Sequence, residues 1–285
     1  MELQLPSKEE KLNVSSLKHF EGEVWMKRDD LIHPFISGNK WRKLAPLIAL
    51  AKEREMKTLV SFGGAWSNHL LALAAAANLH HLKSKAYVRG DTIDNPVLSQ
   101  CRSLGMELEF LDRESYREIR SKLDHLTFKS DELWIPEGAN CKEARAGMQT
   151  LWKELNQSYD IVLDSVGSGT SVRGLFESKP SETRLLGIMA VKDTALAARL
   201  RSEGLEIFEE YAGKGFARVD TNLLELCARF REETGIVLDP VYTSKQWRAL
   251  LDLIDKGIIR GKRILFIHSG GQTGWWSGIG KDYGF

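Results

Sequence analysis

Short apolar runs alternate with amphipathic helical patterns along almost the whole chain, and this alternation restricts the possible fold more than any other feature. Seven runs have the length and residue types of buried strands: VWMKR at Val24, TLVSF at Thr58, KAYVR at Lys85, LEFL at Leu108, DIVLDSV at Asp160, LLGIMAV at Leu185 and ILFIHS at Ile264. Between them, apolar residues recur every three or four positions, as at Ala144, Met148, Leu151, Trp152 and Leu155. The alternation predicts an α/β fold with open, twisted, mainly parallel sheets covered by helices on both faces.

The composition favours small-molecule chemistry over binding to nucleic acid or membranes. With 285 residues, 42% hydrophobic and 28% charged, the chain is long enough for one large domain or two smaller ones. Its 40 basic residues are balanced by 39 acidic ones, so no net charge attracts polyanions. The start of the sequence lacks the order of a secretory signal, and the longest apolar run, from Leu70, is too short to cross a bilayer. We therefore expect a cytoplasmic protein.

The cysteines give no pattern of disulfides or metal ligands. Cys101, Cys141 and Cys227 are widely spaced, without a CxxC pair and without a histidine at metal-ligand spacing. The sequence therefore predicts neither a disulfide framework nor a metal site.

Three glycine-rich segments follow predicted strands directly, where ligands bind in open α/β sheets. They are FGGAWSNH, SVGSGTSVRG and HSGGQTG. In the second segment, Gly167 and Gly169 allow a tight turn, and Ser168, Thr170 and Ser171 add hydroxyl donors. Backbone N–H groups at the start of a helix suit a phosphate, although the spacing matches neither a P-loop nor the GxGxxG fingerprint. The alternative is an ordinary strand-to-helix turn.

In the first of these segments, Ser67 and Asn68 stand where a helix cap belongs, ahead of the alanine-rich stretch. The free N–H groups and the hydroxyl at that place would also bind a small carboxylate. The alternative is that Ser67 only caps the helix and His69 lies on its surface.

The segment SGNKWRKL concentrates Asn39, Lys40, Arg42 and Lys43 at the start of a predicted helix, where the helix dipole disfavours cations. A lone lysine in a helix is usually a solvated charge. However, a lysine combined with two anion sites suits pyridoxal phosphate, which carries both an aldehyde and a phosphate. Its aldehyde reacts with an amine, and nearby cations lower the pKa of a lysine so that more of it is nucleophilic. The preceding acids, Asp29 and Asp30, are expected to pair with Arg28 or Arg42.

Seven ordered segments make the chain resemble the pyridoxal-phosphate-dependent 1-aminocyclopropane-1-carboxylate deaminases and D-cysteine desulfhydrases, within the tryptophan synthase β-like fold. The segments are VWMKRDDL, SGNKWRKL, FGGAWSNHLLALA, IPEGANCKEARAGM, GSGTSVRGL, LDPVYTSK and HSGGQTG. The resemblance covers nearly the whole length. It implies two sheets in two domains, with residues 1–45 and 146–285 forming a larger cofactor-binding domain and residues 46–145 a smaller inserted one. The cofactor would lie in the cleft between them, and a homodimer is expected.

The resemblance also implies roles for individual residues. Lys40 would hold the cofactor aldehyde covalently, and Asn68 would bind the ring hydroxyl oxygen. The phosphate would be held by the loop of Gly167, Ser168, Gly169, Thr170 and Ser171, with Lys43 nearby. Ser67, Asn68 and His69 would face the substrate carboxylate, which agrees with the cap argument. Tyr242 would stand close to the reacting carbons, so Lys40, Tyr242 and Ser67 are the catalytic candidates.

Thr243 would meet the pyridine nitrogen and separates the two activities of the family. A carboxylate there would keep the ring protonated and a stronger electron sink, as opening a cyclopropane requires. A threonine leaves a neutral ring, which is sufficient to eliminate a good leaving group. The deaminases look like PVYE at this place and the desulfhydrases like PVYT, as here. We therefore expect a lyase in which Lys40 removes the α-proton and D-cysteine gives pyruvate, sulfide and ammonia, with the deaminase as the alternative.

Two departures from the family concern the substrate pocket. Phe216 stands where a tyrosine is common, so a second active-site hydroxyl is missing. Trp66 replaces a smaller or more polar residue and would narrow the substrate pocket. A protein that binds the cofactor or an amino acid without turnover is therefore an alternative of another class. A dinucleotide-binding oxidoreductase is disfavoured because the fingerprint is incomplete.

Overall fold

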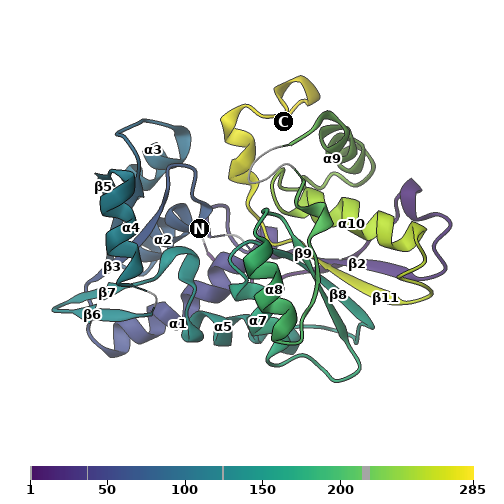
Figure 1. Cartoon of the computed structure of the whole chain (residues 1–285), viewed down its shortest axis with the longest axis horizontal. Helices are drawn as coiled ribbons and strands as arrows, with labels where there is room; N and C mark the ends of the chain where they lie inside the picture. Colours follow the sequence, from purple (N-terminus) through teal and green to yellow (C-terminus); the bar gives the residue numbers. More distant parts are fainter. Residues whose placement is uncertain (1, 37, 124, 214–218) are drawn as a thin grey trace.

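Two β-sheets lie side by side, each surrounded by helices, as Figure 1 shows. The computed structural model describes residues 2–36, 38–123, 125–213 and 219–285. The predicted α/β fold with two open, mainly parallel sheets is confirmed. Phe216 lies outside the described residues.

The larger sheet has six strands and occupies the right half of Figure 1. All neighbouring strands in it are parallel except the first pair, which is antiparallel. In spatial order the strands are β1 (Glu9–Lys11), β2 (Glu23–Lys27), β11 (Arg263–Ile267), β8 (Ile161–Val166), β9 (Arg184–Met189) and β10 (Glu206–Phe208).

The smaller sheet has five strands and lies in the left half of Figure 1. It is parallel apart from one antiparallel pair at its edge. In spatial order the strands are β5 (Met106–Leu111), β4 (Lys83–Arg89), β3 (Thr58–Gly64), β7 (Glu132–Trp134) and β6 (Thr127–Lys129).

All seven apolar runs of the sequence form strands of these sheets, which confirms the interpretation of the alternation. The strands that the sequence did not predict, β1, β6, β7 and β10, have three residues each. Three residues carry too little alternation to be distinguished from loops.

The helices fill the connections between strands. They are α1 (Asn39–Glu53), α2 (Asn68–Leu79), α3 (Pro96–Ser103), α4 (Arg113–Ser121), α5 (Lys142–Met148), α6 (Thr150–Lys153), α7 (Thr170–Phe176), α8 (Thr194–Ser202), α9 (Thr221–Thr234) and α10 (Thr243–Asp255). Helix α2 is buried at every position from 69 to 77, which explains why its sequence is apolar all round instead of amphipathic. No helix among the described residues has the length and the apolar composition needed to cross a membrane.

The larger sheet is covered on both faces, as its continuous apolar strands predicted. In β11, Ile264 and Phe266 belong to one buried cluster, and Leu265 and Ile267 belong to another. Successive side chains of a strand point to opposite faces, so the two clusters are the cores above and below the sheet.

Helix α5 packs against α1 on one side and α7 on the other, and the three helices form a layer along the lower edge of Figure 1 that extends from the smaller sheet to the larger one. The helices approach closely because glycines face their neighbours. A Cβ built on Gly147 would lie 2.0 Å from the carbonyl oxygen of Arg42, and one on Gly174 would lie 2.3 Å from that of Arg145. The domain boundaries at 46 and 145 stay a prediction. Both positions fall inside helices, α1 and α5.

Candidate functional site

A cavity of about 430 Å³ lies where the carboxyl ends of strands from both sheets meet. Its walls include Gly64 at the end of β3, Arg89 at the end of β4, Val166 at the end of β8, and the segment 269–271 after β11. The cavity brings together most of the residues that the sequence singled out: Lys40, Lys43, Trp66, Ser67, Asn68, His69, Gly167, Ser168, Gly169, Ser171 and Tyr242. Thr170 and Thr243 are buried behind its walls.

Lys40 enters the cavity from the first turn of α1, and the turn before it requires glycine. Gly38 has a φ of 63°, and a Cβ there would lie 1.7 Å from the carbonyl oxygen of Ser269. The Nζ of Lys40 donates to Oδ1 of Asn39 at 2.6 Å. The amide nitrogen of Asn39 in turn donates to Oγ of Ser171 at 3.0 Å. This chain of hydrogen bonds links the lysine to the loop after β8.

Both lysines of the cavity have lowered pKa values, so a larger fraction of each is neutral near pH 7 than for an ordinary lysine. Burial lowers the pKa of Lys40 to about 8, although Asp239 and Asp164 oppose the shift. Burial also lowers the pKa of Lys43 to about 7, and the charge of Lys40 adds to the effect. Among the described residues, Lys43 has no hydrogen-bond or ion-pair partner within 4 Å. A neutral lysine amine at ordinary pH is a nucleophile.

The loop between β8 and α7 forms a cradle of backbone N–H groups and hydroxyls. Gly169 adopts the left-handed conformation with a φ of 83°. The hydroxyls of Ser168 and Thr170 lie 3.0 Å apart, and Thr170 also donates to Oδ1 of Asn140 at 3.1 Å. Arg173 forms an ion pair with Glu203 at 2.6 Å, so its charge is already compensated. The loop therefore offers donors to an anion, with Lys43 as the nearby cation.

The loop between β3 and α2 begins the helix as the cap argument predicted. Ser67 accepts a hydrogen bond from the backbone N–H of Leu70 at 3.3 Å. A Cβ on Gly63 would lie 2.8 Å from the Ser67 hydroxyl, so glycine is needed for the tight turn. Oδ1 of Asn68 is buried and has no hydrogen-bond partner among the described residues. A buried polar atom without a partner is costly unless a ligand satisfies it.

The interpretation of His69 as a surface residue is wrong, because only 4% of it is exposed. Its Nε2 lies 2.9 Å from Oγ of Ser61, and that hydroxyl donates its one proton to the carbonyl oxygen of Ile135. The Nε2 of His69 is therefore the donor, which leaves Nδ1 as an acceptor without a described partner. Burial, with the charges of Lys40 and Lys43, lowers the pKa of His69 to about 3. The ring is neutral at ordinary pH.

Tyr242 reaches the cavity from a turn held by Asp239. One carboxyl oxygen of Asp239 accepts from the backbone N–H groups of Val241, at 3.0 Å, and of Tyr242. A Cβ on Gly167 would lie 3.1 Å from the Tyr242 ring, so any larger residue there would displace the ring. Burial and the nearby Asp239 raise the pKa of Tyr242, which keeps its hydroxyl protonated.

The hydroxyl of Thr243 serves the same turn. It accepts from the backbone N–H of Asp239 at 2.7 Å, and the residue is fully buried. Contact between Thr243 and a cofactor ring stays a prediction.

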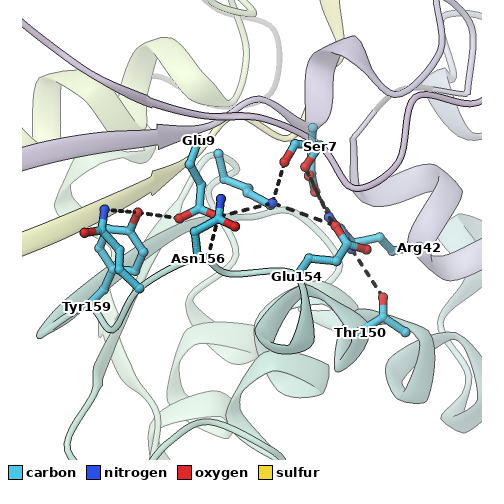
Figure 2. Close-up of polar contacts among 10 residues, drawn as sticks. Ser7, Glu9, Arg42, Thr150, Glu154, Asn156 and Tyr159 are labelled. Atoms are coloured by element: carbon cyan, nitrogen blue, oxygen red, sulfur yellow. Dashed lines mark hydrogen bonds and ion pairs between the residues drawn. The ribbon is translucent and has the colours of Figure 1, made fainter.

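The network around Arg42, between the two lysines, fixes the first turns of α1 (Figure 2). Arg42 binds both oxygens of Asp29, at 2.7 and 2.8 Å, and both oxygens of Glu154, at 2.9 and 2.8 Å. Ser7 donates to Asp29 at 2.6 Å. The prediction that Asp29 and Asp30 pair with Arg28 or Arg42 is confirmed: Asp29 pairs with Arg42 and Asp30 with Arg28.

Several residues in the cavity wall or buried close to it were not anticipated. Asp164 and Asp239 are fully buried carboxyls near the lysines, and burial raises the pKa of each to about 7. Both oxygens of Asp164 and Oδ2 of Asp239 have no hydrogen-bond partner among the described residues. An aspartate inside the apolar run DIVLDSV was the available signal for Asp164. Arg89 and Glu137 also line the cavity, and nothing in their sequence surroundings singled them out.

These groups fit pyridoxal phosphate. Lys40 offers an amine of lowered pKa for the aldehyde, and Asn68 presents an unsatisfied polar oxygen beside it. The loop from Gly167 to Ser171 and Lys43 offer donors and a cation for the phosphate. Within the described ranges, no group of three histidine, cysteine, aspartate or glutamate residues could hold a metal.

Comparison with known proteins agrees with this fit. A family model described as pyridoxal-phosphate dependent enzyme matches residues 9–270. The mitochondrial bifunctional D-cysteine desulfhydrase/1-aminocyclopropane-1-carboxylate deaminase of Arabidopsis thaliana is 28% identical over 297 residues, covering 88% of this chain and 73% of the relative. The 1-aminocyclopropane-1-carboxylate deaminase of Mesorhizobium japonicum is 27% identical over 308 residues, covering 89% of each.

The fold is also that of a solved relative. The crystal structure of a homologue of ACC deaminase superposes with a TM-score of 0.84 at 24% identity, covering 99% of this chain and 94% of the other. The family match spans nearly the whole sequence, and the cavity supplies the amine and the anion cradle that the cofactor needs. The chain therefore belongs to the pyridoxal-phosphate dependent enzymes, with 1-aminocyclopropane-1-carboxylate deaminases and D-cysteine desulfhydrases among its relatives.

Proposed function

We propose that the protein is a lyase that eliminates the β-substituent of a small amino acid, with D-cysteine as the preferred substrate. Water and D-cysteine would give pyruvate, hydrogen sulfide and ammonia. The observation that carries the proposal is a lysine amine of lowered pKa in the same cavity as a hydroxyl-rich glycine loop and the capped start of α2.

Bound pyridoxal phosphate supplies an aldehyde that reacts with amines and a ring that accepts the electron pair released at the substrate α-carbon. The residues of the chain bind the substrate and move its protons. The N–H groups at the start of α2, with the hydroxyl of Ser67, hold the substrate carboxylate. The amine of Lys40 takes the α-proton, and a pKa of about 8 suits a general base near neutral pH.

Tyr242 is the second group with a proton to give. Its raised pKa keeps the phenol neutral, so it donates a hydrogen bond to the sulfur as the bond from sulfur to the β-carbon breaks. Since Asp239 fixes the turn before the ring, the direction of the phenol is set before substrate binds.

The choice of D-cysteine rests on Thr243. A hydroxyl at the pyridine nitrogen leaves the ring neutral, and a neutral ring is sufficient to expel a thiolate but a weak electron sink for opening a cyclopropane.

The alternative, deamination of 1-aminocyclopropane-1-carboxylate, is favoured by one observation that the sequence did not anticipate. Asp239 brings a buried carboxyl into the same turn, and its Oδ2 has no hydrogen-bond partner among the described residues. A carboxylate that reached the ring nitrogen would strengthen the electron sink. The relative in Mesorhizobium japonicum carries the name of that activity.

A substrate panel tests the proposal. Purified protein with pyridoxal phosphate is mixed separately with D-cysteine, L-cysteine, D-serine and 1-aminocyclopropane-1-carboxylate, and sulfide, pyruvate and α-ketobutyrate are measured. We expect sulfide and pyruvate in equal amounts from D-cysteine. Release of α-ketobutyrate from the cyclopropane substrate without sulfide from D-cysteine would establish the alternative. No product from any of them would favour a binding protein.

A further inference from the structure

Arg89 is the cation in the cavity wall that neither the cofactor nor the substrate carboxylate accounts for. It is the last residue of β4, paired in register with Gly64, the last residue of β3. A Cβ built on Gly64 would lie 3.9 Å from Nη2 of Arg89, so the guanidinium rests against the start of the loop that carries Trp66 and Ser67. It therefore lies on the substrate side of the cavity.

The guanidinium of Arg89 has no acidic partner. Within the described parts of the chain it forms no ion pair within 4 Å and no hydrogen bond. Its Cζ lies 5.9 Å from the centre of the Tyr116 ring. An arginine over an aromatic ring at that distance is at the outer limit of a cation–π contact. All five of its N–H donors are thus available to a ligand.

The acidic residue of the same wall does not neutralise it. Glu137 also lines the cavity, but its carboxylate is paired with Arg120 at 2.9 Å. The other cations of the wall, Lys40 and Lys43, are on α1, and the proposed function assigns both to the cofactor. Arg89 therefore leaves a net positive charge at the outer part of the cavity, next to Trp66, which is 41% exposed.

We propose that Arg89 and the adjoining loop form a subsite for a second anionic group, so that the site takes, besides D-cysteine, amino acids with a carboxylate or a similar anion at the far end of the side chain. This inference rests on the proposed function, since it assigns the substrate class of the same site. A guanidinium matches a carboxylate with two parallel hydrogen bonds, which a neutral amide of the same shape cannot replace. D-cysteine, which has no distal anion, would then be a substrate that leaves this subsite unfilled.

Glutamate and glutamine test the subsite, because they have the same shape, differ in the distal charge and carry no β-leaving group. Binding of each, in D and L forms, to the protein loaded with pyridoxal phosphate is measured by calorimetry. We expect the wild type to bind glutamate of the accepted configuration about tenfold more tightly than glutamine, the effect of one charge-assisted hydrogen-bonded pair. In Arg89→Gln the ratio falls to about 1, and in Arg89→Lys part of it remains.

Arg117→Gln is the matched control. Arg117 is an exposed arginine on α4 of the same part of the molecule, and it does not line the cavity. This variant keeps the wild-type ratio. A substrate pair extends the test: S-carboxymethyl-cysteine should exceed S-carbamoylmethyl-cysteine in kcat/KM, and Arg89→Gln should lower that preference about tenfold.

Two results would overturn the subsite: a glutamate-to-glutamine affinity ratio near 1 in the wild type, or a wild-type value of this ratio in Arg89→Gln. The second result would follow if Arg89 held the α-carboxylate, since both ligands would then weaken equally. The calorimetric ratio does not depend on turnover. A protein inert toward D-cysteine that shows the ratio contradicts the proposed function and supports the subsite, and active protein without the ratio contradicts the subsite alone.

Discussion

Two buried groups of charges lie on either side of the first turns of α1, and they differ in how their charges are compensated. In the network around Arg42, shown in Figure 2, Asp29, Glu154 and Ser7 satisfy the guanidinium and one another at 2.6 to 2.9 Å. In the other group, Lys43 lines the cavity and Asp164 is buried near it; both are buried as deeply but form no ion pair within 4 Å among the described residues.

The difference indicates separate roles for the two groups. A buried charge without a partner destabilises the fold, and chains retain it where a ligand completes the set. The paired network fixes α1 to the segment before β1 and to α6, and so fixes the direction of Lys40. The unpaired groups lie in or close to the wall of the cavity that would hold the phosphate and aldehyde of the cofactor and the substrate.

The largest effect on activity is expected from replacing Lys40, whose amine would react with the cofactor aldehyde. Lys40→Ala should lower kcat for the best substrate by about 10²–10⁴-fold, the range for loss of a general base, and should remove the visible absorbance of the lysine-bound cofactor. Its free energy of unfolding should stay close to that of the wild type, since the lysine is not part of the paired network. An unchanged absorbance would place the attachment elsewhere.

Breaking the paired network should instead act on stability. Asp29→Asn leaves Arg42 with one carboxylate in place of two, and we expect the free energy of unfolding to fall by about 3–5 kcal/mol, measured by chemical denaturation. Adding Arg42→Met in the same chain should deepen the loss, because Glu154 then loses the guanidinium that binds both its oxygens and keeps Lys27 at 3.8 Å. A loss below 1 kcal/mol would show that the network contributes little.

Removing the unpaired carboxyl of Asp164, which is buried near the two lysines of the cavity, should change the free energy of unfolding in the opposite direction. Asp164→Asn in cofactor-free protein should raise the free energy of unfolding by about 1–3 kcal/mol above pH 7. The folded pKa of about 7 exceeds the unfolded value of 3.8, so the native state binds more protons between these values and its stability falls as pH rises through them.

The difference between Asp164→Asn and the wild type should therefore be near zero at pH 4, grow toward pH 7 and then stay constant. Denaturation measured across this range checks it. A variant less stable than the wild type at pH 8 would mean that Asp164 is paired in solution.

The smallest effect is expected at the rim of the phosphate cradle. Ser168→Ala removes one hydroxyl donor and should weaken the affinity for pyridoxal phosphate about fivefold, the net value of one hydrogen bond, without changing stability. Titration of the cofactor into the apo-protein measures it. Ser181→Ala, at an exposed serine outside the cavity, is the control, and an equal effect of both changes would argue against the cradle.

The sequence predicted the fold from features that repeat. All seven apolar runs are strands, and the three glycine-rich segments follow β3, β8 and β11 as expected. The helical pattern from Ala144 to Leu155 was continuous in sequence, yet it forms two helices, α5 and α6, with Gln149 between them. Spacing alone does not show such a break, because the apolar stripe continues across it.

The site was predictable where a local motif carries the chemistry and not where distant elements meet. The loop from Gly167 to Ser171 was singled out by its own residues, and Lys40 by its combination with the glycine-rich segments and by the resemblance to the family. Arg89 lines the cavity and Asp164 is buried near its lysines because β4 and β8 end close together, which depends on how the two sheets face each other. A surface position for His69 was left open as an alternative to a role at the substrate carboxylate, because a histidine after a cap is usually solvated, and the packing of α2 on its sheet buries it.

The most direct measurement of the central claim is the site of covalent attachment. The wild-type protein with pyridoxal phosphate is reduced with borohydride, digested and mapped by mass spectrometry. We expect the pyridoxyl group on Lys40 alone, because its amine lies in the cavity with a pKa near 8 and is linked through Asn39 to the loop after β8. A label on Lys43 in its place, or a protein that takes up no label, would contradict the assignment of this cavity.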